Sequence, residues 1–290
     1  MRTATRLFSN SAFGKGNAHS LSHGELRRKL RDPSRPPVVC CLSSMLGDTS
    51  HVEILGALNF LDFLWVECEH SVMSASDCLP TYIAAERRGL PCLTRVGCCP
   101  DDRGEIMKHL ISGSQGIILP TCESRAQAEA IVEAVKFPPI GKRGMAGDRW
   151  CTWGLSGEDT STCIAESNAN SVVGVMIETL EGVENIDDIL AVDEVDFCAI
   201  GPNDLSASMG LVGQPRHPEV VKLTEEIGAR VMNANKATGT LVLNGDDYAY
   251  WRDRGFQVMI TIAQTFFVGG ASVMKQHVQN YESGRDGTPS

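Results

Sequence analysis

The segment Val172-Val173-Gly174-Val175-Met176-Ile177-Glu178 is a continuous apolar run that ends in an acid. Such a run, without polar alternation, is typical of a parallel strand whose two faces are both covered by helices. The carboxylate of Glu178 would therefore close a buried strand, where a bare charge costs several kcal/mol or is forced to protonate. A partner for this charge is expected.

Seven further segments have the pattern of such strands, and helical patterns alternate with them. Ser124-Arg125-Ala126-Gln127 is a capping-box pattern before a helix predicted at 126–135, and further helices are predicted at 101–112 and 219–234. Eight strand–helix units without a domain-like linker favour a closed (β/α)8 TIM barrel, one α/β domain over residues 25–281. An open doubly wound sheet is the alternative, but no Gly-rich dinucleotide loop supports it. The seven strand segments are 38–42, 63–67, 92–96, 116–120, 196–201, 239–243 and 257–263.

The composition is that of an ordinary globular chain: 42% of the 290 residues are hydrophobic and 21% are charged, with a formal net charge of −10. No run of about 18 apolar residues suggests a membrane span. No basic stripe interleaved with aromatic residues suggests nucleic acid as a partner. The 11 cysteines are odd in number and include no C-x-x-C pair, which is unlike a disulfide framework or a zinc site. A reduced, intracellular compartment is expected.

The two ends of the chain are expected to lie outside the barrel. Residues 1–24 contain Arg2, Arg6 and Lys15 and no acid, which is similar to a mitochondrial transit peptide, although an ordinary polar arm is the simpler interpretation. We therefore expect a cytoplasmic protein, with a mitochondrial location as the alternative. The polar tail 282–290 is expected to be frayed.

Residues 136–170 form a connection that is too long for a plain loop between a helix and the next strand. The connection carries Arg143, Trp150 and Trp153. Long ordered loops on a barrel often serve the active site, so both tryptophans could line a site for an apolar or aromatic substrate. The connection could equally be a surface excursion whose tryptophans pack against the barrel.

Function in a (β/α)8 barrel collects at the carboxyl ends of the strands. There the sequence places Glu67 and His70 after the second strand, Arg95 on the third, Glu178 on the fifth and Asp204 after the sixth. Two carboxylates on consecutive strands predict a shared hard divalent cation, for which Mg²⁺ and Mn²⁺ are both suitable. This pair makes the chain a candidate metal-dependent enzyme.

Each of these residues also has a plainer interpretation. Glu178 could be an ordinary strand-end acid, and Asp204 could cap the helix that follows it. Arg95 could be a structural ion-pair partner, and His70 a loop histidine with satisfied hydrogen bonds. Cys68 lies between two acids, which would raise its thiol pKa and make it a poor nucleophile.

Several short motifs together resemble the HpcH/HpaI aldolase family, which are metal-dependent pyruvate aldolases of the phosphoenolpyruvate/pyruvate barrel superfamily. The likeness covers roughly residues 38–275. The motifs that carry it are Glu69-His70, Arg95, Gly116-Ile-Ile-Leu-Pro120, Phe137-Pro-Pro-Ile-Gly-Lys-Arg-Gly144, Met176-Ile-Glu178 and Gly201-Pro-Asn-Asp-Leu-Ser206.

The resemblance implies roles for the residues at the strand ends. Glu178 and Asp204 would hold the divalent metal, Arg95 would grip a 2-keto acid such as pyruvate or oxaloacetate, and His70 would handle protons with Glu67 beside it. It also implies a homo-oligomer, commonly a hexamer, whose C-terminal helix packs on a neighbour. Further residues expected at the keto-acid pocket are Trp65, Pro120, Met176, Gly201 and Pro202.

The chemistry expected of these groups can be argued from the reaction itself. Cleaving a bond next to a pyruvate carbon passes through an enolate, whose oxygen a divalent ion and an arginine can stabilise. A histidine can accept the hydroxyl proton of an aldol near neutral pH. The rival route uses a Schiff-base lysine on a strand, and none of the predicted strands contains a lysine. The sequence therefore favours the metal route.

Two residues depart from the family pattern. Family members usually carry aspartate where Glu67 stands, and often glutamine where Met176 stands. Because both positions fall in the predicted pocket, the acceptor or the reaction could differ. The expected function is a class II aldolase that converts a 2-keto-hydroxy acid to pyruvate and an aldehyde. The alternatives are an oxaloacetate decarboxylase or carbon–carbon bond-forming synthase of the macrophomate synthase or citrate synthase type, and a barrel that binds a keto acid or a protein partner without catalysis.

Overall fold

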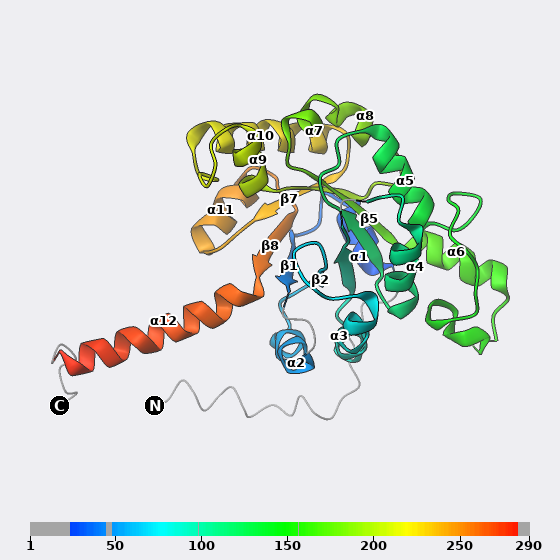
Figure 1. Cartoon of the computed structure of the whole chain (residues 1–290), viewed down its shortest axis with the longest axis horizontal. Coiled ribbons are helices and arrows are strands. Elements are labelled where there is room, and N and C mark those ends of the chain that lie inside the picture. Colours follow the sequence, from blue (N-terminus) through cyan, green and yellow to red (C-terminus); the bar gives the residue numbers. More distant parts are fainter. Residues whose placement is uncertain (1–23, 45–47, 98, 156, 284–290) are drawn as a thin grey trace.

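The computed structural model describes residues 24–44, 48–97, 99–155 and 157–283. Their strands form a closed barrel in which each strand is parallel to the next in chain order, and β8 pairs with β1 (Figure 1). The predicted (β/α)8 barrel is confirmed, and the open sheet is not formed. The strands are β1 Val38–Ser43, β2 Phe63–Glu67, β3 Cys92–Arg95, β4 Gly116–Leu119, β5 Val172–Ile177, β6 Phe197–Ile200, β7 Ala237–Leu241 and β8 Val258–Ile262.

Helices cover the outside of the barrel between successive strands. The capping box predicted at Ser124 forms, because its side chain accepts from the Gln127 N–H while the Gln127 amide accepts from the Ser124 N–H. The helices are α1 Glu25–Leu30, α2 Thr49–Leu58, α3 Ala75–Arg87, α4 Arg103–Ser112, α5 Arg125–Val135, α6 Thr160–Asn170, α7 Leu180–Glu184, α8 Ile186–Leu190, α9 Pro202–Ser208, α10 Pro218–Asn233, α11 Gly245–Asp253 and α12 Ala263–Glu282, with the 3-10 helix η1 at Arg149–Gly154.

The barrel interior is filled by side chains at alternate strand positions. Large and small residues face one another there: a Cβ on Gly174 of β5 would lie 2.4 Å from the ring of Phe197 on β6. The strand limits differ from the predicted ones by at most two residues. The largest shift is in β7, which begins at Ala237 because that residue pairs with Phe197 in the barrel register.

The N-terminal mouth of the barrel is closed by α1. Its Leu26 and Leu30 are buried in the interior cluster, and Arg27 donates to a buried carboxylate oxygen of Asp196 at 2.9 Å. Asp196 also accepts from Arg31 and, through its second oxygen, from the backbone N–H of Val173. This network occupies one end of the barrel, so the opposite end is left for a site.

The chain passes directly from β8 into α12, which projects away from the barrel (Figure 1). Its exposed side chains include Phe267, Val273, Met274 and Val278. Among the described residues, no helix is both long enough and apolar enough to cross a membrane. The predictions made for residues 1–23 and 284–290 concern segments outside the described residues.

Candidate active site

The carboxyl ends of neighbouring strands bring several of the predicted site residues to one rim. Because Trp65 and Met176 belong to the interior cluster, the residues two positions further along, Glu67 and Glu178, also face the interior. Arg95 pairs with Glu67 in the register of β2 and β3. The predicted convergence on the carboxyl ends of β2, β3 and β5 is therefore found.

Arg95 is held by two acids. Its Nε and Nη2 atoms each lie 2.7 Å from Oε2 of Glu67, and its Nη1 lies 3.0 Å from Oε2 of Glu69. Nη1 also lies 3.4 Å from the sulfur of Met176. The Arg95 residue is only 6% exposed, and these contacts hold its planar guanidinium group in one orientation.

Glu67 plays a different part from the one suggested by the sequence. Besides binding Arg95, it accepts the backbone N–H groups of Glu69 and His70 at 2.9 and 3.0 Å through Oε1. The acid near the His70 ring is Glu69, whose Oε2 lies 3.5 Å from Nε2. Glu67 thus positions the guanidinium and the turn after β2, while Glu69 lies between Arg95 and the histidine.

Glu178 is buried, with 3% of the residue exposed. Its Oε1 accepts the backbone N–H of Thr121 at 2.8 Å and lies 3.3 Å from the Thr121 hydroxyl. Its Oε2 is buried and has no hydrogen-bond partner among the residues that the structure describes. Burial raises the pKa of Glu178, and the negative charge of Asp204 raises that pKa further. A buried carboxylate oxygen without a hydrogen-bond partner in the described part of the chain therefore belongs to a group that is within electrostatic reach of a second acid.

Asp204 lies in the first turn of α9, and the residue is exposed. The N-cap of α9 is Gly201, and no side-chain hydrogen bond caps the helix. The capping role considered for Asp204 is therefore not formed. Its position at a helix N-terminus favours a carboxylate there, and its charge acts on Glu178 across the rim.

Gly201 makes the room that Glu178 needs. A Cβ at Gly201 would lie 2.2 Å from Oε2 of Glu178, far inside van der Waals contact. Oε2 of Glu178 therefore occupies the space that a side chain at position 201 would fill.

The donor set at this rim fits a hard divalent cation. When ionised, Glu67, Glu69, Glu178 and Asp204 carry four negative charges, against one positive charge on Arg95. The excess negative charge, the orphaned Oε2 and the neighbouring Asp204 are what a cation with oxygen ligands requires. Glu178 and Asp204 are the residues that would hold it.

Thr121 was not among the predicted residues. It follows Pro120 at the end of β4 and has a positive φ of 46°, which is uncommon for a residue with a β-branched side chain. This conformation directs its backbone N–H to Glu178. A proline that ends a strand marks a change in chain direction, but the sequence does not specify where the following N–H points.

The other predicted pocket residues form the floor and walls. Trp65 is buried below Arg95, whose Cζ lies 5.8 Å from the centre of its ring system. Pro120 is buried at the end of β4, and Pro202 is half-buried at the start of α9. His70 is exposed, with 64% of its side chain accessible to solvent.

A cavity of about 360 Å³ opens at the same end of the barrel, beside the residues that precede Asp204. Pro202 and Asn203 border it, and Leu241 and Ile262 line it from the last positions of β7 and β8. The remaining lining residues are mostly apolar or aromatic: Pro215, Arg216, Val221, Thr224, Thr240, Leu243, Asp247, Tyr250 and Trp251.

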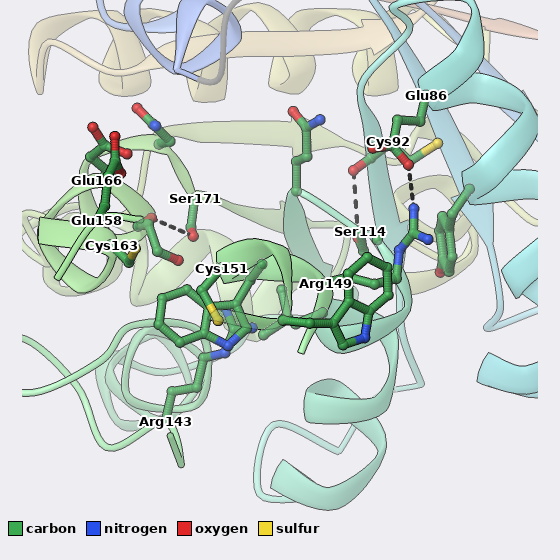
Figure 2. A pocket seen from close by; sticks show the side chains of 18 of the residues that line it. Glu86, Cys92, Ser114, Arg143, Arg149, Cys151, Glu158, Cys163, Glu166 and Ser171 are labelled. Carbon is green, nitrogen blue, oxygen red and sulfur yellow. Dashed lines mark hydrogen bonds and ion pairs between the residues drawn. The ribbon is translucent and has the colours of Figure 1, made fainter. Parts of the chain in front are cut away.

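The tryptophans of the 136–170 connection do not join this rim. Trp150 packs on Phe137, with ring centres 4.6 Å apart, and Trp150 and Trp153 line a separate cavity of about 350 Å³ (Figure 2). That cavity also contacts Cys92 and Ser171, which lie at the start of β3 and directly before β5. The connection therefore lies on the flank toward the N-terminal ends of the strands, as the packing interpretation expected.

The described strands contain no lysine, in agreement with the sequence-based argument against a Schiff base. Two buried lysines lie at the other end of the barrel. Lys136 Nζ donates to the carbonyl oxygens of Asn168 and Ser171, and Lys236 Nζ donates to those of Val192 and Val195. Both ammonium groups thus donate hydrogen bonds to backbone carbonyl oxygens at that end of the barrel.

Comparison with known proteins agrees with this geometry. The profile of the family described as HpcH/HpaI aldolase/citrate lyase matches residues 48–265. A 4-hydroxy-2-oxovalerate aldolase of Novosphingobium aromaticivorans is 31% identical over 220 residues, which cover 76% of each chain. The crystal structure of an HpcH/HpaI aldolase from Desulfitobacterium hafniense DCB-2 superposes with a TM-score of 0.77 at 26% identity, covering 86% of this chain and 96% of that one. The citrate synthase SbnG has the same TM-score at 25% identity, covering 89% and 98%.

Proposed function

We propose that this chain cleaves a 4-hydroxy-2-keto acid to pyruvate and an aldehyde with the help of a divalent metal. The chain belongs to the HpcH/HpaI aldolase/citrate lyase family and is a carbon–carbon lyase. The observation that carries this proposal is the orphaned, buried Oε2 of Glu178, whose carboxyl group lies within electrostatic reach of Asp204 and Arg95. We propose Mg²⁺ or Mn²⁺ as the ion, because the candidate ligands are carboxylate oxygens.

The bound ion would supply a Lewis acid for the keto and carboxylate oxygens of the substrate. Arg95 donates hydrogen bonds to the same oxygens, and Glu67 and Glu69 hold the guanidinium so that little reorganisation is needed as charge develops. Negative charge that forms on the enolate oxygen is then met by a donor already in place.

His70 is the group that accepts the proton. It takes the proton of the C4 hydroxyl, the C3–C4 bond breaks, and C4 leaves as the aldehyde while the bonding electrons form the enolate across C2 and C3. Return of a proton to C3 gives pyruvate. Exposure of the ring lets it exchange protons with solvent, and Oε2 of Glu69 lies 3.5 Å from its Nε2.

The apolar cavity at the rim is where we place the aldehyde part of the substrate. It is bordered by Pro202 and Asn203, which precede Asp204, and is lined by Leu241 and Ile262. Filling it in a Leu243→Trp variant should raise KM for a substrate with a long alkyl aldehyde portion while leaving cleavage of the shortest substrate unchanged. Equal effects on both substrates would remove this cavity from the proposal.

The decisive experiment compares wild type with Glu178→Gln, each with and without a chelator, in a pyruvate-release assay on 4-hydroxy-2-keto acids. We expect turnover by the wild type to stop on chelation and return with Mg²⁺ or Mn²⁺. Full turnover by chelated protein or by Glu178→Gln would sink the metal mechanism.

A second candidate reaction is decarboxylation of oxaloacetate, or addition of its enolate to another electrophile. The observation that favours it is the contact between Met176 and Arg95, because a thioether is a weak acceptor and leaves the keto-acid side of the pocket more apolar. Similarity to the citrate synthase SbnG supports this candidate too. Measuring carbon dioxide release from oxaloacetate beside aldol cleavage separates the two reactions.

We also propose that the protein is a homo-oligomer in which α12 packs on a second copy. The helix leaves the barrel carrying Phe266, Val273, Met274 and Val278 on its exposed surface. Light scattering during gel filtration gives the mass directly, and a monomer at micromolar concentration would contradict this proposal.

A further inference from the structure

A cluster of two thiols and one imidazole lies behind the rim, and the proposed lyase reaction does not use it. Cys68 follows β2, Cys78 lies on α3 and His109 lies on α4. One ligand atom from each residue lies within 4.8 Å of the other two, and the two sulfurs are 3.6 Å apart. Cys78 and His109 are buried, while Cys68 is half-buried.

The spacing of these atoms is that of ligands around one ion. With Zn–S distances of about 2.3 Å, two sulfurs of a zinc tetrahedron lie about 3.8 Å apart. The sulfurs of a disulfide are only about 2.05 Å apart, so Cys68 and Cys78 would have to approach by more than 1 Å to form one. The observed 3.6 Å is therefore close to the tetrahedral separation and far from that of a disulfide.

The imidazole of His109 is oriented as a metal ligand is. Its Nδ1 lies 2.8 Å from the hydroxyl of Tyr82, and that hydroxyl lies 2.8 Å from Oγ1 of Thr94. This bond fixes the ring and leaves Nε2 as the nitrogen for a ligand.

Glu105 of α4 lies outside this three-residue group but contacts its imidazole. Oε1 of Glu105 lies 3.3 Å from Nε2 of His109. With metal–oxygen and metal–nitrogen distances of about 2.0–2.1 Å, two such ligands of one tetrahedral ion lie about 3.3 Å apart. Glu105 is partly exposed, so its side chain also provides the route by which an ion can enter.

We propose that Cys68, Cys78 and His109 bind a soft divalent cation, with zinc as the natural occupant, and that Glu105 turns toward the ion to give the fourth ligand. Sulfur and nitrogen ligands prefer a softer ion than the carboxylate pair Glu178 and Asp204 does, so the two sites are expected to bind different metals. With Glu105 turned toward the ion, all four positions would be filled by protein ligands, which is the arrangement of a structural metal rather than a catalytic one.

The proposed ion would brace the residues that hold Arg95. Cys68 lies between Glu67 and Glu69, and its backbone N–H donates to the carbonyl oxygen of Arg95 at 3.0 Å. Coordination would tie the turn after β2 to α3 and α4. The loop that carries His70 would then be fixed from behind.

The test counts the second metal in protein whose first site is disabled. The full chain carrying Glu178→Gln, kept reduced and freed of metal, is titrated with Co²⁺ and then with Zn²⁺. We expect one equivalent of Co²⁺ to give a near-ultraviolet thiolate charge-transfer band and the visible spectrum of tetrahedral cobalt. Zinc should displace the cobalt. A missing thiolate band would overturn the proposal.

Further variants locate the site. Adding Cys68→Ser should weaken zinc binding by at least about 100-fold, and adding Tyr82→Phe by about 10–100-fold, because the phenol orients the ligand. Cys163→Ser, a half-buried cysteine of α6, is the matched control and should bind like its parent. Because Cys68 is half-buried, its serine variant is expected to fold. A thiolate band that persists in Cys68→Ser, or a Cys68–Cys78 disulfide found with no retained zinc, would also contradict the proposal.

Discussion

The substitution Gly201→Ala tests the geometry of the candidate metal site without removing any of its ligands. The new Cβ would lie 2.2 Å from Oε2 of Glu178 and 3.2 and 3.3 Å from its Cβ and Cδ. Ordinary contact begins at 3.4 Å, so the carboxylate has to move by about 1.2 Å. The backbone of Gly201, with φ −89° and ψ 93°, is accessible to alanine, so the effect is steric rather than conformational.

The expected loss follows from that displacement. A shift of about 1 Å in a reacting group can cost a factor of about 100 in rate, which corresponds to about 2.7 kcal/mol of transition-state stabilisation. We therefore expect kcat/KM to fall by about 100-fold and the affinity for Mn²⁺ to weaken by about 10-fold or more. The hydrogen bond from Thr121 to the other oxygen of Glu178 opposes any rotation that would relieve the clash.

Steady-state pyruvate release and a manganese titration by calorimetry measure the two quantities. Gly245→Ala is the matched control, since a Cβ there meets nothing within 4 Å. Adding Glu178→Asp to Gly201→Ala withdraws the carboxylate by one methylene group and should recover part of the manganese affinity. If Gly201→Ala kept wild-type affinity and turnover, Glu178 would not be the ligand that this geometry implies.

Four further substitutions follow from the same contacts. Glu178→Gln should abolish metal-dependent turnover yet raise the Tm of the metal-free protein by a few degrees at neutral pH. The sign follows from linkage: burial raises the pKa of Glu178 above 4.5, so its ionisation destabilises the fold as pH rises through the raised pKa, and glutamine, which does not ionise, removes that pH dependence. Arg95→Lys should lower kcat/KM by about 100-fold with little loss of stability, because lysine cannot reproduce the fork held by Glu67. His70→Asn should lower kcat by about 100-fold or more while manganese affinity, followed by calorimetry, is unchanged. Asp196→Ala should lower the free energy of unfolding by about 3–5 kcal/mol in urea titrations, since Arg27 loses its buried partner.

The barrel could be predicted because parallel strands covered on both faces need apolar residues at every position. Eight mostly apolar segments in the chain meet that requirement, and the strands lie within two residues of the predicted limits. The same regularity located the site in outline. Glu67, Arg95 and Glu178 lie at the ends of strands, so the closure of the barrel alone brings them to one rim.

Contacts that depend on side-chain direction could not be predicted in this way. Glu67 was expected beside His70, and its Oε1 does accept the His70 backbone N–H, but its Oε2 meets Arg95 at the same register, a contact that the sequence did not predict. Trp150 and Trp153 were possible substrate contacts, yet the connection that carries them folds onto the opposite flank. Thr121 contributes through its backbone, which has no sequence signature.

The thiol cluster shows a second limit. Metal motifs are recognised in a sequence by closely spaced ligands, and the absence of a C-x-x-C pair argued against a zinc site. Cys68, Cys78 and His109 come from a turn and two different helices, so their proximity is a product of the packing of α3 against α4. Only the folded structure brings these three side chains together, so no motif of closely spaced ligands in the sequence could have predicted the cluster.

The two departures from the family pattern meet at one group. Glu67 holds Nε and Nη2 of Arg95, and Met176 faces Nη1. A longer acid satisfies one edge of the guanidinium completely, whereas a thioether competes only weakly for the other. The donors on the Met176 side are therefore the ones most easily given to a substrate oxygen. In the proposed reaction, substrate choice would depend on how Arg95 divides its donors between Glu69 and the keto acid, and the weak acceptor Met176 would favour the keto acid.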